Sequence, residues 1–184
     1  MPVCAITNGM SASCDDLTRI GGVNKRAWVF NLEDQYGKPD YTTDVDGYVT
    51  AITFPTYAGT YKFETKKNSH TGGYTIVSAE GGNKFFQHDV TMKLFATTPA
   101  DDDVIRELLP ANTVVILETN NQEFLIYGAN NGLECLEGTQ NSGQADNADT
   151  TTNLTFQGAE KQPPLRFFVT DYATTLTTLE GYEI

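Results

Sequence analysis

Histidine, cysteine and tryptophan are scarce in this chain, whose 184 residues include two His, three Cys and one Trp. Histidine is the commonest general base and metal ligand, so two widely separated copies give little basis for either role. The cysteines, Cys4, Cys14 and Cys135, are odd in number and form no CxxC pair, which favours reduced thiols over a zinc site. For Cys4 and Cys14, two interpretations stay open: a bridge formed in an oxidising medium, or two small buried side chains.

The short sequence patterns of common enzymes are also missing. The chain contains no Gly-x-Ser-x-Gly, His-Glu-x-x-His, Gly-x-x-x-x-Gly-Lys-Ser/Thr or Gly-x-Gly-x-x-Gly, which removes the usual evidence for acyl transfer, zinc hydrolysis and nucleotide chemistry. His88 falls on the apolar side of a segment and is interpreted as a core imidazole, whereas His70 is expected to face solvent. Asp44-Val45-Asp46-Gly47 resembles part of a calcium loop without its remaining ligands. We therefore expect no enzymatic activity, no cofactor and no metal.

Long apolar runs and excess positive charge are absent as well. No stretch reaches the ~18 apolar residues of a membrane helix, and residues 1–10 lack the charged start and apolar core of a secretory signal. We expect folding in the cytoplasm and no membrane association. Acidic residues outnumber basic ones 24 to 12, for a formal charge of −12, which opposes adsorption to nucleic acid or anionic lipid.

The sequence has a strong alternation of apolar and polar residues, typical of half-buried antiparallel strands. In Phe85–Leu94 the even-numbered residues from Phe86 to Leu94 are apolar or His88, and the odd-numbered ones from Gln87 to Lys93 are polar. We expect further strands at Ala27–Asn31, Tyr48–Phe54, Thr60–Thr65, Tyr74–Ala79, Thr113–Glu118, Phe124–Tyr127, Leu133–Leu136, Asn153–Gln157 and Leu165–Val169. The prediction is a mainly β protein, an antiparallel β-sandwich or open barrel.

One short flanking α-helix is expected at about residues 99–109. Thr98-Pro99-Ala100-Asp101 has the layout of a capping box with Pro at the first helical position. The three aspartates 101–103 fall in the first turn, where the helix dipole favours negative charge. Apolar residues at helical spacing follow, and Pro110 supplies the end of the helix.

The remaining segments complete a single domain over residues 1–184. Residues 35–47 and 138–152 are rich in Gly, Asp, Asn and Thr and are expected to be flexible loops. Gly72-Gly73 is interpreted as a turn. The C-terminal extension 171–184 alternates Thr with Leu, and predicts either a strand donated to another subunit or a frayed end.

The order of these segments resembles the tail tube proteins of long-tailed bacteriophages, which are related to the tubes of contractile tails. The resemblance begins at Cys4, Gly9, Cys14-Asp15 and Gly21-Gly22-Val23, followed by Trp28–Asn31. It continues through Tyr61–Glu64, Phe85–Leu94, the short helix, Thr113–Leu117, Phe124–Gly128 with Gly132-Leu133, and Leu154–Glu160 before Pro163-Pro164. It covers most of the chain, and matches least at residues 140–152 and beyond Val169.

The resemblance implies a structural virion protein that assembles into hexameric rings, which stack into the tail tube. Implied partners are further copies of the chain and other tail proteins such as the tape measure, the terminator and the baseplate or tip. The protein would be assembled in the host bacterial cytoplasm, and DNA would pass through the tube without specific binding. Acidic side chains lining the bore would repel DNA, and Asp89 and Glu64 are the candidates, with an outer solvated position as the alternative for both.

Other functions remain open at this point. A related ring protein, such as a tail terminator, a head decoration protein or an injection-system tube, would have a similar composition. A glycan- or protein-binding module could use the aromatic loops at Tyr36, Tyr41 and Tyr57. An acidic β-barrel enzyme is the least favoured, because no catalytic pattern is present.

Overall fold

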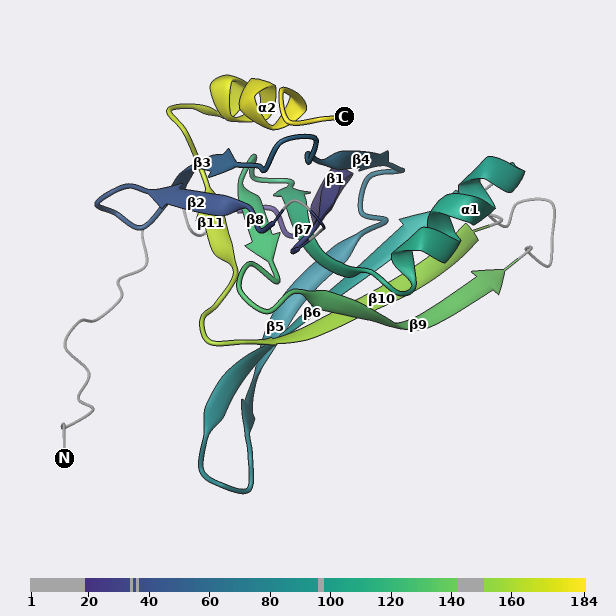
Figure 1. The fold of residues 1–184 in the computed structure, drawn as a ribbon, viewed down its shortest axis with the longest axis horizontal. Helices are drawn as coiled ribbons and strands as arrows, with labels where there is room; N and C mark the ends of the chain where they lie inside the picture. The colour runs from purple at the N-terminus through teal and green to yellow at the C-terminus, as the bar shows by residue number, and fades with distance from the viewer. Residues whose placement is uncertain (1–18, 34, 36, 96–97, 142–150) are drawn as a thin grey trace.

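A computed structural model describes residues 19–33, 35, 37–95, 98–141 and 151–184 (Figure 1). Of the described residues, 51% lie in strands and 12% in helices, which confirms the mainly β prediction. The strands are β1 (Val23–Asn31), β2 (Asp40–Thr43), β3 (Val49–Thr53), β4 (Tyr61–Glu64), β5 (Thr71–Ser78), β6 (Lys84–Leu94), β7 (Asn112–Thr119), β8 (Phe124–Tyr127), β9 (Leu133–Asn141), β10 (Thr151–Glu160) and β11 (Leu165–Phe167), and the helices are α1 (Pro99–Leu108) and α2 (Tyr172–Glu180).

The strands form one strongly curled, mixed sheet of eleven members in the order β2-β3-β11-β8-β7-β9-β10-β6-β5. Off this path, β1 pairs with both β7 and β4. The pairings between the described strands are antiparallel except for the short parallel contact of β11 with β3. Because β7 pairs with β8 over most of its length and touches β9 only at Asn112 and Thr113, the sheet divides there into two layers.

The first core lies between these layers. Val90 and Met92 of β6 and Leu154 and Phe156 of β10 face Ala27, Val29, Val115, Leu117 and Tyr127 of the other layer. The even-numbered residues of β6 from His88 to Leu94 are buried and the odd-numbered ones are partly exposed, as the alternation predicts. Gly72 lets β5 approach this core, since a Cβ there would lie 2.6 Å from Leu117 Cδ1.

The second core lies on the opposite side of β1, β7 and β8. Trp28, Ile116, Phe124 and Ile126 pack there with Val49, Phe167 and Leu179. Strand β7 is therefore buried on both faces, Val114 and Ile116 in the second core and Val115 and Leu117 in the first. This arrangement explains why its apolar residues are continuous and do not alternate.

Helix α1 agrees with its prediction. The Thr98 side chain accepts a hydrogen bond from Asp101 N, and Asp101 Oδ2 accepts one from Thr98 N at 2.8 Å, which completes the capping box. Leu108 and Ile105 pack against the first core. Acidic side chains in the first turn and Arg106 in the last suit the helix dipole.

The C-terminal extension differs from its prediction, because its residues form α2 over the second core instead of a donated strand or a frayed end (Figure 1). Asp171 caps the helix by accepting from Thr174 N at 2.9 Å. Leu179 is fully buried, and Trp28 Nε1 donates to Glu183 Oε1 at 3.0 Å. The end of the chain is thus part of the fold.

Three smaller predictions were also wrong. The expected loop at 35–47 contains β2, the expected turn at Gly72-Gly73 lies inside β5, and β9 continues to Asn141 within the expected loop at 138–152. Residues 142–150 lie outside the described ranges. Pairing with β10 explains the extension of β9, since backbone hydrogen bonds to a neighbouring strand override the loop-like composition of Gly138–Asn141.

Candidate functional site

The most distinctive surface is the side of β9, β10, β6 and β5 that faces away from the first core, which we call the outer face. These strands are consecutive neighbours in the sheet. Both helices pack on other surfaces, α1 against the first core and α2 against the second. Its residues are Thr71, Gly73 and Thr75 of β5; Gln87, Asp89, Thr91 and Lys93 of β6; Asn153, Thr155 and Gln157 of β10; and Glu134, Glu137 and Thr139 of β9.

The charge of the outer face is negative. Asp89, Glu134 and Glu137 contribute three carboxylates, and Lys93 is the one basic residue among the positions that define the face. Most other positions are Thr, Asn or Gln, which carry no charge. A phosphate backbone near this face would meet net repulsion and no cluster of cationic donors.

Of the two acidic residues singled out from the sequence, only Asp89 lies on the outer face. Asp89 is half-buried and stands opposite Gln157 and Gly73. Glu64 lies on β4 opposite Arg26, on the side of Trp28 and the second core. Its carboxylate is 3.5 Å from Lys25 Nζ. The first core therefore separates the two carboxylates, and they do not line one surface.

Within the described part of the chain, two unpaired strand edges bound the outer face. Among the described strands, β5 pairs only with β6, and β9 pairs with β10 along its length and with β7 only at its first two residues. The β5 sequence, TGGYTIVS, contains neither a charged residue nor proline. Natural proteins usually protect exposed edges with charges, proline or bulges. Strand β5 lacks the first two of these devices and is open to pairing with another strand.

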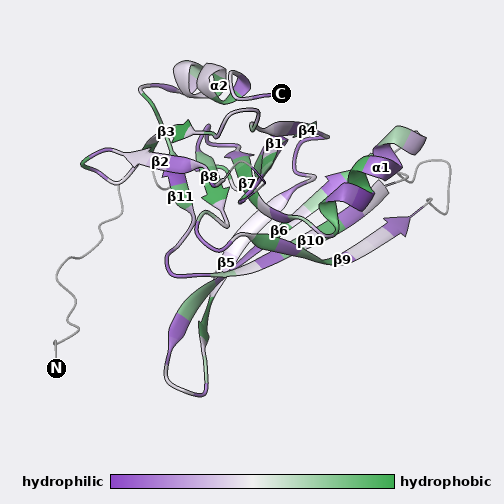
Figure 2. Cartoon of the chain, in the orientation of Figure 1, coloured by the Kyte–Doolittle hydropathy of each residue, from purple (hydrophilic) through white to green (hydrophobic). Residues whose placement is uncertain are grey.

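One end of β5 and β6 projects from the body as a two-stranded hairpin (Figure 1). The pairing of β6 with β10 ends at Phe86 opposite Glu160, whereas β6 and β5 continue to pair as far as Lys84 and Ser78. We call residues 76–86 the arm. Its strands carry Ile76, Val77, Phe85 and Phe86, and Figure 2 shows hydrophobic colour on both of them. Ile76 is 61% exposed.

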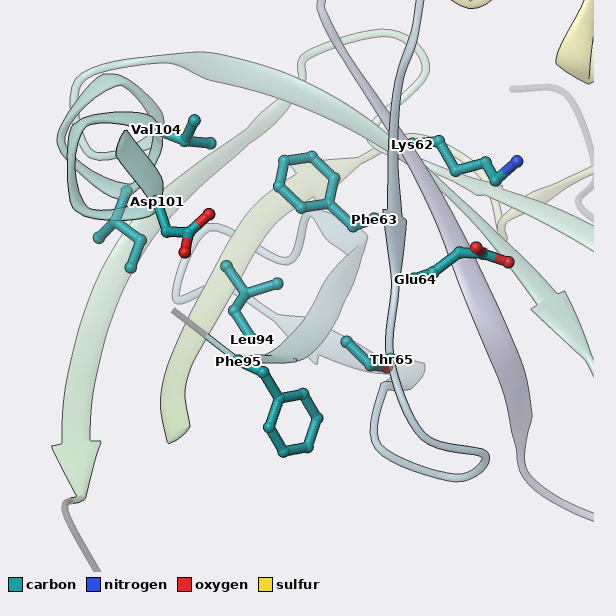
Figure 3. Close-up of a pocket in the computed structure, with 9 residues that line it drawn as sticks. Lys62, Phe63, Glu64, Thr65, Leu94, Phe95, Asp101 and Val104 are labelled. Carbon is teal, nitrogen blue, oxygen red and sulfur yellow. The ribbon is translucent and has the colours of Figure 1, made fainter. Parts of the chain in front are cut away.

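The structure also contains a groove between β4 and α1, at the other end of β6 (Figure 3). A cavity of ≈ 280 Å³ is lined by residues that include Phe63, Leu94, Val104 and Ile105. A second hollow of ≈ 240 Å³ shares Phe63 and Val104 with the first. We call the two hollows together the α1 groove. In Figure 3, Phe63 and Leu94 point toward the space beside α1.

Both histidines are buried. His88 is 2% exposed; its Nε2 lies 3.0 Å from the carbonyl oxygen of Gln162, and its Nδ1 accepts from Gly128 N at 3.2 Å. Burial lowers the pKa of His88, and the neutral ring joins two loops, as the core interpretation requires. His70 is 1% exposed, so the expectation that it faces solvent was wrong. Burial lowers the pKa of His70 to about 4.

Two buried carboxylates have structural partners. Glu160 is 1% exposed and accepts hydrogen bonds from the backbone amides of Asn130 and Asn131 at 3.0 and 2.9 Å. It thereby fixes the turn between β8 and β9. Glu118 is fully buried, with Oε2 2.9 Å from Arg26 Nε. The Tyr172 hydroxyl donates to Glu118 Oε1 at 2.7 Å and joins α2 to β7.

The acidic clusters noted in the sequence also have structural explanations. Asp44 Oδ1 accepts from Asp46 N at 3.0 Å and from Tyr48 N at 2.9 Å, in the turn between β2 and β3. Gly47 has a φ of 87°, which favours glycine at that position. Among the residues described, no group of three or more His, Cys, Asp and Glu side chains is arranged to hold a metal ion.

Of the cysteines and loop tyrosines singled out from the sequence, the structure describes Cys135, Tyr41 and Tyr57. Cys135 is a free, half-buried thiol that packs against the first core, whereas Cys4, Cys14 and Tyr36 lie outside the described ranges. Tyr41 packs against the second core and Tyr57 is 82% exposed. No helix in the described part of the chain has the length and apolar character needed to cross a bilayer.

Sequence reasoning missed Glu134 and Glu137 of the outer face and the apolar residues of the arm. The strand at residues 133–136 was expected to end before Glu137, and a bulge between Cys135 and Glu137 breaks the alternation that would have identified its outward side. For the arm, the alternation of Phe85–Leu94 was visible, but the sequence does not reveal that β10 ends opposite Phe86.

Comparisons with known proteins add no assignment. No known family matches the chain, no curated protein matches it, and no solved structure matches it. The resemblance to tail tube proteins therefore stays a prediction drawn from the sequence.

Proposed function

We propose that this chain is a structural subunit that assembles into rings, and that the rings stack into the tail tube of a bacteriophage, through which DNA passes. One observation carries the proposal: a polar, negatively charged sheet face is bounded by two strand edges, and no other described segment covers the face or pairs with those edges. The free edge of β5 in one copy pairs with the free edge of β9 in the next. Repetition of this heterologous contact closes a ring whose inner surface is the outer face of each copy.

The dimensions agree with such a ring. Neighbouring strands are about 4.8 Å apart, so six copies with four strands each give a circumference of roughly 115 Å and a backbone diameter of roughly 37 Å. Strand tilt increases both values. After side chains are placed on the inner surface, the remaining bore is wide enough for a DNA duplex. Asp89, Glu134 and Glu137 of each copy give the bore a negative lining, which weakens adhesion of the phosphate backbone.

Electron microscopy of the concentrated, purified protein tests the proposal. Long hollow tubes are the expected result, short rings would favour a terminator or another connector, and single particles at all salt and protein concentrations would contradict self-assembly. Tubes of the unmodified chain should not retain short duplex DNA. Tubes of Asp89→Lys/Glu137→Lys should retain it, because the lining becomes basic at two positions in each copy.

Glu64→Lys is the matched control for DNA retention, since Glu64 lies beyond the first core on a different surface. Because Glu64 also borders the α1 groove, its tube formation is checked first. We expect its tubes to retain no more DNA than the unmodified tubes. Equal DNA retention by the Glu64 and Asp89/Glu137 variants would contradict a bore lined by the outer face, even if the tubes form normally. Loss of tubes in the Glu64 variant alone would show that β4 takes part in assembly.

A further inference from the structure

The arm has the properties of a segment that is completed by a partner. Beyond Phe86 it is a ribbon of two strands, and no third strand among the described residues pairs with it. Such a ribbon is marginally stable in water by itself. Ile76 and Phe86 stand opposite each other on one of its faces, and Val77 and Phe85 on the other. Ile76 is exposed, and Val77, Phe85 and Phe86 are half-buried, with Phe86 packed against the ring of Tyr74. Both faces of the arm therefore present apolar surface that is partly open to solvent.

The α1 groove offers a surface of matching chemistry. Phe63, Leu94, Val104 and Ile105 line its larger hollow, and Val104 is 41% exposed. Phe63 extends from β4 toward α1 in Figure 3, whereas Lys62 and Glu64 point to the other side of the strand. The groove thus has an apolar floor formed by β4, the end of β6 and one side of α1.

An arm cannot reach the groove of its own chain. The arm lies at the first residues of β6 and the groove at its last residue, Leu94. The eleven residues of the strand hold the two ends about 33 Å apart. A contact between arm and groove therefore requires two copies, and it runs along the strand direction instead of across the sheet edges.

Charge is also compatible with this contact. The whole chain carries a formal charge of −12, so most of its surface repels a second copy. The arm includes one acidic residue, Glu80, and one basic residue, Lys84, and has no net charge. The charged residues that border the groove are Lys62, Glu64, Asp101 and Glu107, which together are net negative. A segment without net charge that carries Lys84 is compatible with this acidic rim.

We propose that the arm of one copy binds in the α1 groove of another, where Ile76 and Phe86 pack against Phe63, Leu94 and Val104. The inference rests on the proposed function in one respect, namely that copies of this chain assemble. It adds a second heterologous contact, directed along β6, to the lateral pairing of β5 with β9. Together the two contacts extend an assembly in two directions, within a ring and between rings.

Sedimentation velocity over a range of concentrations tests the contact. Ile76→Asp places a charge on the arm and Val104→Asp places one in the groove, and both positions are exposed enough for the monomer to tolerate the change. Each variant should weaken association between rings by at least ~tenfold. Val45→Asp is the control, because Val45 is fully exposed in the turn between β2 and β3, and its association should match that of the unmodified chain. The far-UV circular dichroism of each variant checks its fold.

A photo-cross-linking amino acid at position 76 identifies the surface that the arm meets. An equal mixture of isotopically light and heavy chains separates links between copies from links within one. We expect mixed-isotope links to residues 61–65, 94 or 101–108. Links confined to other segments, or unchanged assembly of Ile76→Asp, would overturn the arm contact while self-assembly stands. A chain that stays monomeric at every concentration would overturn both proposals.

Discussion

Replacement of Arg26 by Met tests how α2 is held on the sheet. Glu118 is fully buried, and Arg26 Nε lies 2.9 Å from its Oε2. Asn24 Nδ2 and the Tyr172 hydroxyl each donate to Glu118 Oε1 at 2.7 Å. In Arg26→Met the carboxylate keeps these two neutral donors but loses its cation. Removal of one partner of a buried pair costs about 3–5 kcal/mol in the free energy of unfolding, which lowers the Tm by about 6–20 °C for a chain of this size.

The fluorescence of Trp28 provides the assay. It is the only tryptophan, it is fully buried in the second core, and it bonds to Glu183 beyond α2. Urea unfolding followed at this residue therefore reports on the part of the fold that Arg26 supports. Arg26→Met/Glu118→Leu is the matched control, because it removes both charges and should be less destabilised than Arg26→Met alone. A double variant less stable than the single one would refute the argument from an uncompensated buried charge.

Two further predictions concern stability. The pKa of His70 is lowered from 6.5 to about 4 by burial. As the pH falls, the imidazole therefore becomes protonated in the unfolded chain before it does so in the folded chain. Above pH 6.5 the His70 ring is neutral in both states and does not lower the free energy of unfolding. As the pH falls from 6.5 to 4, the free energy of unfolding decreases by up to about 3 kcal/mol. Urea midpoints between pH 7.5 and 4.5 should fall less for His70→Gln than for the unmodified chain; equal slopes would contradict this assignment. Gly72→Ala should cost about 1–3 kcal/mol in urea unfolding, since its Cβ would lie 2.6 Å from Leu117 Cδ1. The control Gly73→Ala, with no atom within 4 Å of its Cβ, should be neutral or stabilising, and equal losses would contradict the close approach.

The sequence predicts those parts of the fold that depend on local pattern. The alternation in β6 correctly identifies Val90 and Met92 as core residues, and Thr98 with Asp101 identifies the start of α1. Both signals arise within a few residues of the chain. They report side-chain direction and backbone capping, which need no knowledge of distant segments.

Helix α2 was missed because its local preference and its tertiary context disagree. Four threonines in YATTLTTLE favour extended structure. In the fold, the hydroxyls of Thr175, Thr177 and Thr178 donate to carbonyls four residues earlier. Leu179 is fully buried in the second core. Burial against a sheet formed by distant residues decides the conformation.

The candidate site was predicted in part, because a surface depends on strand neighbours as well as on strand direction. The outward position of Asp89 follows from the alternation of β6, and Glu64 also belongs to an alternating strand. Only the pairing of β4 with β1 places Glu64 beyond the first core. Likewise, the free edges and the arm result from where β10 and β7 stop pairing, which no single segment encodes.

The central position of β7 has a consequence for how the chain folds during synthesis. Strand β1 is made early, yet Trp28 stands opposite Ile116 of β7, so β1 cannot complete its pairing until most of the chain has left the ribosome. The second core is complete only after α2 has been synthesised, because Leu179 of α2 packs in that core. Closing such distant contacts is intrinsically slow. During this interval the nascent chain has unpaired strands exposed to solvent. Where ribosomes are close together, the unpaired strands of neighbouring nascent chains can associate with each other.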